Sequence, residues 1–385
     1  MVKVGEEFVR TEVQFIPAKL KVIDHYRETY ECRSCRKNGT PYMEKAPVPY
    51  PPVLHSLASA STIAWLIHQK FELGIPLYRQ EKEWEALGLR LNRATMSNWL
   101  LVVYRDWLVH IVHRLKQELL KQRYLHIDET HVQVLKESGR KNTSDSYMWV
   151  YCSIKDAVTP IRYFEYQPGR SGKYPEAFLK GYEGYIHTDA YSGYNAVSGV
   201  KRCLCYTHLR RAFVDALPKD IHTPEASKPA EAILRLNELF GIESELETLS
   251  PDQKKKERLI REKPLLEAFW SWSEKSAIGE LPKSKLSKAF HYALNNREGF
   301  FHYLEDGNCS ISNSLAENCI RPFVIGRKNW LFSGSPKGAE ASAGIYTLVE
   351  TAKANGLAPM KYIKYILSDI CLLYTSDAAD DLTRV

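Results

Sequence analysis

The stretch Tyr124–Asp128 reads YLHID, and 61 positions later Tyr185–Asp189 reads YIHTD. Both stretches are rich in residues that favour β-strands, and both end in a carboxylate. Side chains alternate along a strand, so each aspartate shares a face with the histidine and the tyrosine before it. If the two strands are parallel neighbours, both carboxylates project at one edge of the sheet, where such sheets bind their ligands.

Asp128 and Asp189 are therefore expected to lie close together. Two neighbouring carboxylates repel each other unless a cation or a proton lies between them, and a divalent ion is the natural partner. His126 and His187 are expected to pack beside the aspartates rather than to bind the ion.

The pattern around the repeat predicts an α/β fold. Strands are expected at 124–130, 147–154, 161–166, 185–189 and 202–206, with helices near 174–180 and over 207–217. Three consecutive strands, a helix, a strand, a helix and a strand is the order of a ribonuclease-H-like mixed sheet. In such a sheet the first and fourth strands lie side by side.

Length and charge limit the classes of function. A chain of 385 residues has room for two or three domains, and its net charge of +7 is concentrated at 110–123, 201–211, 254–263 and 321–328. Basic clusters favour a polyanion such as nucleic acid, although each taken alone is also compatible with an ordinary solvated surface. No apolar run approaches the roughly 20 residues of a membrane span, and no export signal is present, so a cytoplasmic location is expected.

Residues 1–50 are expected to form a partial zinc-finger-like module, because Cys32 and Cys35 have the spacing of half a zinc site. No second cysteine pair follows, and His25 and His55 are the nearest other ligands. Two unligated, reduced thiols are the alternative.

Residues 55–122 have helical spacing, with helices expected over 57–71, 76–87 and 95–120. The break at Gly88 resembles the turn of a helix-turn-helix unit. In that case the second helix would present Arg93 and Asn98 to a DNA groove. A plain helical hairpin fits the pattern equally well.

The remaining boundaries follow from composition. Residues 123–217 are expected to form the first part of the sheet domain, 218–305 a charged helical insertion, and 306–370 the last part of the domain, with helices at 314–321 and 338–355. Residues 371–385 resemble a translated sequencing adapter and are expected to be a non-native tail.

A third carboxylate is provided by Glu317, far beyond the second aspartate in sequence. Spacing alone leaves two interpretations open, because Ser314 and Glu317 also have the spacing of a helix-capping box. Cys205 and His208 have the spacing of half a metal site, or they pack structurally near the acids.

Four longer motifs resemble those of insertion sequence 66 family transposases. They are Asp128–Thr130, Thr188–Tyr194, Cys205–Arg211 and Leu315–Ser335, and the similarity covers roughly residues 10 to 367. The resemblance implies a ribonuclease-H-like domain with an Asp-Asp-Glu triad, carried here by Asp128, Asp189 and Glu317. Such chemistry uses two Mg²⁺ or Mn²⁺ ions roughly 3.5–4 Å apart. Our hypothesis is that Asp128 bridges both ions, and that Asp189 and Glu317 each bind one of them.

The same resemblance implies DNA as the partner, both as terminal inverted repeats and as target, and at least a homodimer on DNA because two ends must be joined. Water would cut the element end, and the freed 3′-hydroxyl would then attack target DNA. The family's zinc module has an earlier cysteine pair, which would lie before Met1, so the chain is expected to be truncated at both ends.

Further DNA contacts are expected near the acids. The candidates are Arg210, Arg211, Arg327, Lys328 and Trp330. Ordinary surface charge and a core tryptophan are the alternatives. Two other functions remain open: an inactive transposase remnant that only binds DNA, and a serine or tyrosine recombinase, for which the chain has no arginine-rich nucleophile pocket.

Overall fold

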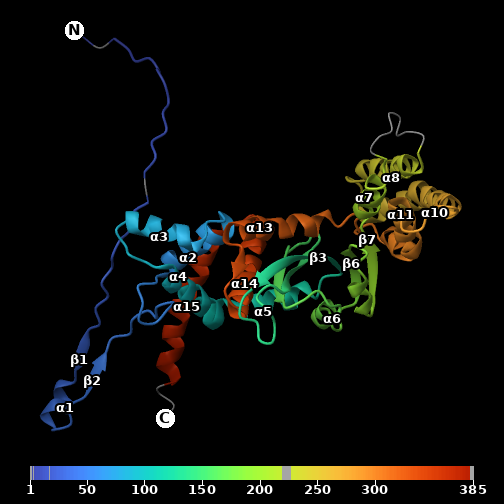
Figure 1. Ribbon diagram of the computed structural model, residues 1–385. Coiled ribbons are helices and arrows are strands. Elements are labelled where there is room, and N and C mark those ends of the chain that lie inside the picture. Colours follow the sequence, from blue (N-terminus) through green and yellow to red (C-terminus); the bar gives the residue numbers. More distant parts are fainter. Residues whose placement is uncertain (1, 3, 17, 219–226, 382–385) are drawn as a thin grey trace.

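The computed structural model describes residues 2, 4–16, 18–218 and 227–381, with side chains up to residue 370. The chain is elongated, with N-terminal helices at one end, a sheet in the middle and a helical group at the other end (Figure 1). No helix in the described part of the chain has the length and apolar character needed to cross a membrane.

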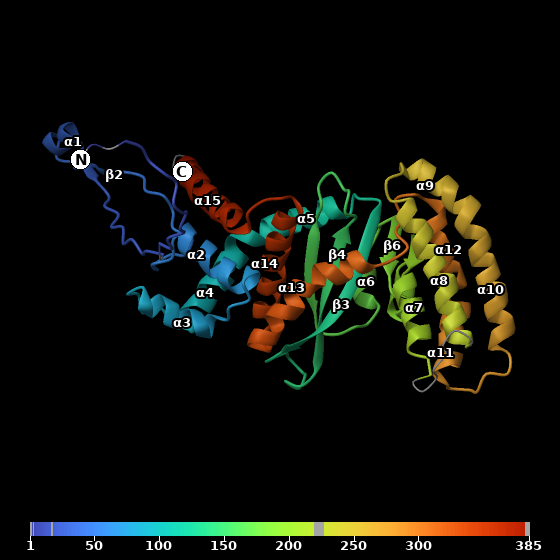
Figure 2. The ribbon, with the colours of Figure 1, turned by 90° about the horizontal axis from the view of Figure 1, so that it is seen from above.

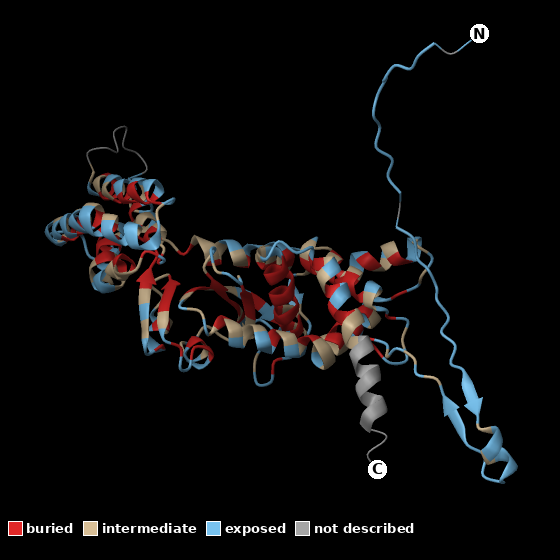
Figure 3. Cartoon of the chain, turned by 180° about the vertical axis from the view of Figure 1, so that it is seen from behind, coloured by how far each residue is buried: buried red, intermediate tan, exposed pale blue. Residues whose placement is uncertain are grey.

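The N-terminal segment forms a small exposed hairpin. Strands β1 (Thr29–Glu31) and β2 (Met43–Lys45) pair antiparallel around the short helix α1 (Arg33–Lys37). None of the residues in these three elements is buried, and the hairpin projects away from the rest of the chain (Figure 3).

The next region is helical, as predicted. Helix α2 (Ala60–Ile67) continues into the π-helical turn η1 (His68–Glu72), and α3 (Leu77–Ala86) follows. Helix α4 (Arg93–Val103), the turn η2 (Tyr104–Leu108) and α5 (Val109–Leu119) then form one long run. This run begins two residues before the predicted start, because the Asn92 side chain accepts a hydrogen bond from the Thr95 N–H (2.8 Å) and caps α4.

The central sheet has the order β5-β4-β3-β6-β7, with β8 pairing the far end of β3. Its strands are β3 (Tyr124–Val134), β4 (Asp145–Ser153), β5 (Arg162–Gln167), β6 (Gly184–Thr188), β7 (Val200–Leu204) and β8 (Phe332–Ser333). β4 is antiparallel to both β3 and β5, whereas β6 and β8 run parallel to β3. The chain is thus a mixed α/β protein, and the predicted adjacency of the first and fourth strands is confirmed.

Three shorter elements connect the second half of the sheet. They are α6 (Lys173–Phe178) between β5 and β6, the 3₁₀ turn η3 (Ser192–Ala196) between β6 and β7, and α7 (Tyr206–Val214) after β7. The two predicted helices near 174–180 and over 207–217 correspond to α6 and α7.

Three helices follow near the C-terminus, and two of them pack against the sheet (Figure 2). Helix α13 (Ser314–Trp330) contacts β3 and β4, α14 (Pro336–Ala354) contacts β5, and α15 (Pro359–Asp381) contacts α2. The backbone N–H groups of Arg162 and Phe164 on the edge strand β5 donate to the hydroxyls of Thr351 (3.1 Å) and Thr347 (2.9 Å) on α14. Helix α14 therefore covers this edge of the sheet. The side chains of the predicted non-native tail lie outside the described residues.

A second helical group packs at the other end of the sheet. It comprises α8 (Lys228–Glu245), α9 (Pro251–Glu257), η5 (Arg258–Glu262), α10 (Lys263–Ala277), α11 (Lys285–Asn295), α12 (Arg297–Phe301) and η6 (His302–Glu305). These helices share a hydrophobic core with α7 and β7, distinct from the main core between the sheet, the N-terminal helices and α13–α15. The predicted helical segment is thus helical from residue 228, residues 219–226 lie outside the described residues, and the domain boundaries remain predictions.

Candidate active site

The pairing of β3 with β6 brings the two halves of the repeat into register. Tyr124 pairs with Tyr185 and His126 with His187, which is the same offset as in the sequence. The tyrosine rings stack with centroids 5.7 Å apart, and the histidine rings with centroids 4.2 Å apart. Two residues further along the same face, Asp128 lies in β3 and Asp189 directly follows β6. The register thus brings Asp128, in the middle of the long strand β3, level with Asp189, just beyond the end of β6.

The two histidines are packed and hydrogen-bonded, as predicted. His187 Nδ1 is 3.1 Å from the Leu125 carbonyl oxygen, and its Nε2 accepts a hydrogen bond from the Ser310 N–H (2.9 Å). His126 Nδ1 is 3.0 Å from Asn313 Oδ1. Burial, followed by the neighbouring His187, lowers the pKa of His126, so its ring is neutral.

Glu317 reaches this region from the first turn of α13. The residue before the helix, Asn313, fixes the helix start: its side-chain amide donates to the Ile127 carbonyl oxygen (2.7 Å), and its backbone N–H donates to Cys205 Sγ (3.1 Å). The capping-box interpretation of Ser314 and Glu317 is wrong. The N-cap residue is Asn313, not Ser314, and its side chain makes no hydrogen bond to the first turn of the helix. The Ser314 hydroxyl bonds instead to that of Ser312 (2.9 Å).

The acids influence one another electrostatically. Burial, followed by the charge of Glu129 and then those of Asp189 and Glu317, raises the pKa of Asp128 to about 7. A hydrogen bond from the Glu129 N–H to Asp128 Oδ1 (2.9 Å) opposes this shift but does not cancel it. Asp128 thus lies half-buried within electrostatic range of both other predicted acids, an arrangement that favours bound cations or protons.

Two arginines that the sequence did not single out hold the turn after β6. Arg202 donates to the Thr188 hydroxyl (2.7 Å) and to the carbonyl oxygens of Asp189 (2.6 Å) and Tyr191 (2.8 Å). Arg170 donates to Glu129 Oε1 (2.6 Å), and its Nη2 lies 3.7 Å from Asp189 Oδ2. These contacts join residues far apart along the chain, so no local pattern could have indicated them.

A family model described as "Transposase IS66 family" matches residues 55–341, and a second, described as "zinc-finger binding domain of transposase IS66", matches residues 1–36. The chain belongs to the IS66 family of transposases. The first match spans the whole central sheet and includes Asp128, Asp189 and Glu317, whereas the second includes Cys32 and Cys35.

Three similar proteins come from Sinorhizobium fredii. Uncharacterized protein y4hP is 26% identical over 96% of this chain and 68% of its own length. Uncharacterized proteins y4jD and y4qI are each 28% identical, over 93% and 96% of this chain and 71% and 69% of their own lengths. The similarity thus extends along nearly the whole transposase chain.

The basic residues predicted to contact DNA occupy two parts of the transposase near the acids. On α7, Arg211 is exposed, and Arg210 Nε donates to Asn237 Oδ1 on α8 (2.7 Å). On α13, Lys328 is exposed, and Arg327 donates to the Thr130 hydroxyl (3.3 Å) on the same face of β3 as Asp128. Because α13 is one continuous helix, Arg327 lies about 15 Å along its axis from Glu317.

Trp330 has a packing role at the end of α13. Its ring is half-buried against the main core, and Lys70 Nζ lies 3.6 Å from the ring centroid. Of the predicted contacts on α4, Arg93 is exposed with its guanidinium 5.8 Å from the Tyr78 ring centroid, and Asn98 is exposed.

The proposed zinc ligands Cys32 and Cys35 lie at the start of α1. Hydrogen bonds with the backbone and side chain of Cys35 lower the pKa of the Cys32 thiol. Among the residues that the structure describes, no third histidine, cysteine or carboxylate ligand atom lies near enough to both thiols to complete a three-ligand group. The described residues therefore provide two thiols here and no complete set of zinc ligands.

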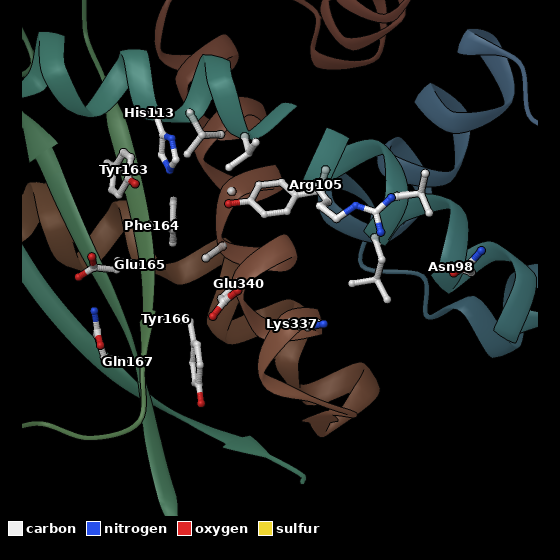
Figure 4. A pocket seen from close by; sticks show the side chains of 17 residues that line it. Asn98, Arg105, His113, Tyr163, Phe164, Glu165, Tyr166, Gln167, Lys337 and Glu340 are labelled. Carbon is white, nitrogen blue, oxygen red and sulfur yellow. The ribbon is translucent and has the colours of Figure 1, made fainter. Parts of the chain in front are cut away.

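A cavity of about 600 Å³ lies between α4, η2, α5, β5 and α14 (Figure 4). Polar side chains from several elements line it, including Asn98, Arg105, Glu165, Lys337 and Glu340. Asp128, Asp189 and Glu317 are absent from its lining, so this cavity is not part of the acid site.

Proposed function

We propose that this IS66 family transposase is a metal-dependent DDE enzyme that cuts and joins DNA strands at element ends. In this proposal Asp128, Asp189 and Glu317 hold two Mg²⁺ or Mn²⁺ ions on a ribonuclease-H-like sheet. The observation that carries it is the parallel register of β3 and β6, which aligns the two aspartates, together with the Asn313 contacts that hold the start of Glu317's helix against β3.

The donor set fits divalent cations that prefer oxygen ligands. Three carboxylates from separate elements interact unfavourably at Asp128, and Glu317 Oε1 is buried with no hydrogen-bond partner in the described part of the chain. The nearby guanidinium of Arg170 donates to Glu129 and lies 3.7 Å from Asp189 Oδ2, so it offsets only part of this negative charge. When bound, the metal ions would activate the attacking hydroxyl and stabilise the leaving oxyanion.

The protein's own groups would supply position and charge. Asp128 is our candidate for the ligand shared by both ions, because its carboxylate interacts with both other acids. Arg202 holds the backbone on either side of the Asp189 carboxylate, so this ligand needs little reorganisation. Arg211 and Lys328, both exposed, would neutralise DNA phosphates near the acids, and Arg210 and Arg327 lie beside them.

Recognition of the element ends would belong to the N-terminal region. The helices α3 and α4 contact each other and are joined by a short turn through Gly88, whose φ is +89°. The exposed Arg93 and Asn98 on α4 are available for DNA contacts. The Cys32–Cys35 half-site supports a zinc-dependent fold for the preceding hairpin, with the missing ligands supplied from outside this segment.

The test is cleavage of a supercoiled plasmid that carries the element ends, in Mg²⁺ or Mn²⁺. Asp128→Ala should lower strand cleavage by at least about a thousandfold, because several kcal/mol of transition-state stabilisation depend on the metal site. DNA binding by gel shift should change by less than about twofold. Asp145→Ala, at an exposed aspartate on β4, is the matched control and should cut normally.

Two outcomes would contradict the proposal. An Asp128→Ala protein that still cuts would remove this residue from the reaction. A wild-type protein that binds the ends but cuts in neither metal would be a DNA-binding remnant, and a covalent adduct formed in EDTA would indicate a recombinase instead.

A further inference from the structure

Three potential ligands of different chemistry meet beside the acid triad. Cys205 directly precedes α7, His208 lies in its first turn, and Glu317 lies in the first turn of α13. One ligand atom from each residue lies within 4.8 Å of the other two. The backbone N–H of Asn313 donates to Cys205 Sγ (3.1 Å), so the starts of the two helices are tied together at this point.

Two polar atoms in this group face each other without a partner. His208 Nδ1 and Glu317 Oε1 are 3.7 Å apart, which is too long for a hydrogen bond. Each is buried and makes no hydrogen bond within the described part of the chain. Leaving a buried polar atom unpaired costs about 1–3 kcal/mol, so two such atoms directed at one gap indicate a missing group between them.

The separations suit a metal ion. Zinc binds sulfur at about 2.3 Å and nitrogen or oxygen at about 2.0–2.2 Å, so its tetrahedral ligands lie roughly 3.3–3.7 Å from one another. The 3.7 Å between His208 Nδ1 and Glu317 Oε1 is at the upper end of this range.

A second group of ligands in the chain lacks these features. His187, Cys203 and Cys309 also bring three ligand atoms within 4.8 Å, and all three residues are buried. Both ring nitrogens of His187 are already engaged, by the Leu125 carbonyl oxygen and the Ser310 N–H. This group has no unpaired nitrogen to offer, whereas the group of Cys205, His208 and Glu317 does.

We propose that Cys205, His208 and Glu317 form a binding site for a thiophilic divalent cation, with Zn²⁺ the ion that the sulfur, nitrogen and oxygen ligands select. Three protein ligands leave a fourth position open to water or to a DNA oxygen. Glu317 is shared with the proposed magnesium site, so zinc would compete with magnesium for this carboxylate. Only that competition depends on the proposed function; metal binding does not.

The experiment uses the full chain carrying Cys32→Ser and Cys35→Ser, which removes the N-terminal thiols. After treatment with EDTA and dialysis, the protein is titrated with Co²⁺, whose thiolate charge-transfer and tetrahedral absorption bands report a sulfur ligand. Zn²⁺ binding is then measured by competition with Co²⁺. We expect the bands in this parent protein, their loss in Cys205→Ser, and at least about tenfold weaker binding in His208→Asn and Glu317→Gln.

Cys203→Ser is the matched control, because this thiol is buried two residues from Cys205 and belongs to the other group. Its bands should equal those of the parent. His208 is half-buried, so His208→Asn is expected to fold. This variant therefore still tests the proposal if Cys205→Ser fails to fold. Absence of the bands in the parent, or their persistence in both Cys205→Ser and His208→Asn, would overturn the proposal. None of these measurements requires DNA or cleavage, so they stand apart from the test of the proposed function.

Discussion

Two regions of this protein bury charged side chains, and they treat the charge in opposite ways. In the helical group, the fully buried guanidinium of Arg258 has all five N–H groups accepted. The acceptors are both carboxylate oxygens of Glu243 (2.5 and 2.9 Å) and the carbonyl oxygens of Tyr303, Asp306 and Cys309. At the acid site, Asp128 accepts one backbone hydrogen bond and is surrounded by carboxylates.

The difference separates a structural charge from a functional one. Arg258 joins η5 and α8 to residues 303–309, the segment that leads back towards α13, so its interactions are complete without any ligand. Among the residues that the structure describes, Asp128 has no cationic partner of its own, and Asp189 is paired only at 3.7 Å, with Arg170. Perturbed, incompletely paired carboxylates of this kind are typical of functional sites, and the proposed function supplies the missing cation.

The substitution Arg258→Met tests the buried charge of the helical group, and its expected effect is the largest. Removing one partner leaves the buried Glu243 carboxylate without its main cation, and we expect the free energy of unfolding to fall by about 3–5 kcal/mol. Denaturant titration followed by circular dichroism measures this change. Arg261→Met is the matched control, because Arg261 lies three residues away in the same η5 turn and pairs with Glu245 near the surface. Its loss should cost about 0–1 kcal/mol.

The double variant Arg258→Met/Glu243→Leu sharpens the same comparison. Replacing both charges by apolar groups removes the unpaired carboxylate, so this protein should recover part of the stability that Arg258→Met loses. If the two variants are equally unstable, the ion pair matters less than the three carbonyl contacts of Arg258.

At the acid site, removing a charge is expected to raise the free energy of unfolding, whereas Arg258→Met lowers it. Burial raises the pKa of Asp128 to about 7, so between about pH 4 and pH 7 the folded protein holds a proton that the unfolded chain has released. In EDTA, the stability contributed by Asp128 should therefore decrease as the pH rises through this range. At pH 8, Asp128→Asn should be more stable than wild type by about 2–4 kcal/mol, although it cannot cut DNA.

Denaturant titrations at pH 5 and pH 8, with EDTA or with Mg²⁺, measure both effects. The advantage of Asp128→Asn should shrink at pH 5, where wild-type Asp128 is protonated in the fold. It should also shrink in Mg²⁺, because bound metal stabilises only the wild-type site. If Asp128→Asn is no more stable than wild type in EDTA at pH 8, the buried charge of Asp128 does not lower the free energy of unfolding.

The order of the predicted strands and helices, which is that of a ribonuclease-H-like sheet, predicted the pairing of β3 with β6. Strand alternation then predicted that Asp128 and Asp189 lie on one face. The strand boundaries followed from the same period, with differences of one to four residues at the ends. β3 continues to Val134, beyond the predicted end, because it pairs with β4 and, at its far end, with β8.

The rest of the site depends on contacts that no local pattern encodes. Glu317 could not be separated from a capping residue by spacing, because the role of Asn313 becomes visible only when its side chain reaches Ile127. From the sequence alone, no role at the acid site was predicted for Arg170 or Arg202. Their roles beside Asp189 depend on how the loop after β5 and the strand β7 pack against β6.

The smallest of the expected effects concerns Asn313, which joins the strand of Asp128 to the helix of Glu317. Its side chain donates to the Ile127 carbonyl oxygen and bonds to His126 Nδ1, beside Asp128 at one end and Glu317 at the other. Asn313→Ala should lower the free energy of unfolding by about 1–3 kcal/mol, because buried polar groups lose their partners. Cleavage should fall by more than this stability loss explains, since α13 would no longer hold Glu317 against β3. The exposed Asn318→Ala on the same helix should change neither quantity, and equal behaviour of the two variants in denaturant and cleavage assays would show that Glu317 is positioned by other contacts.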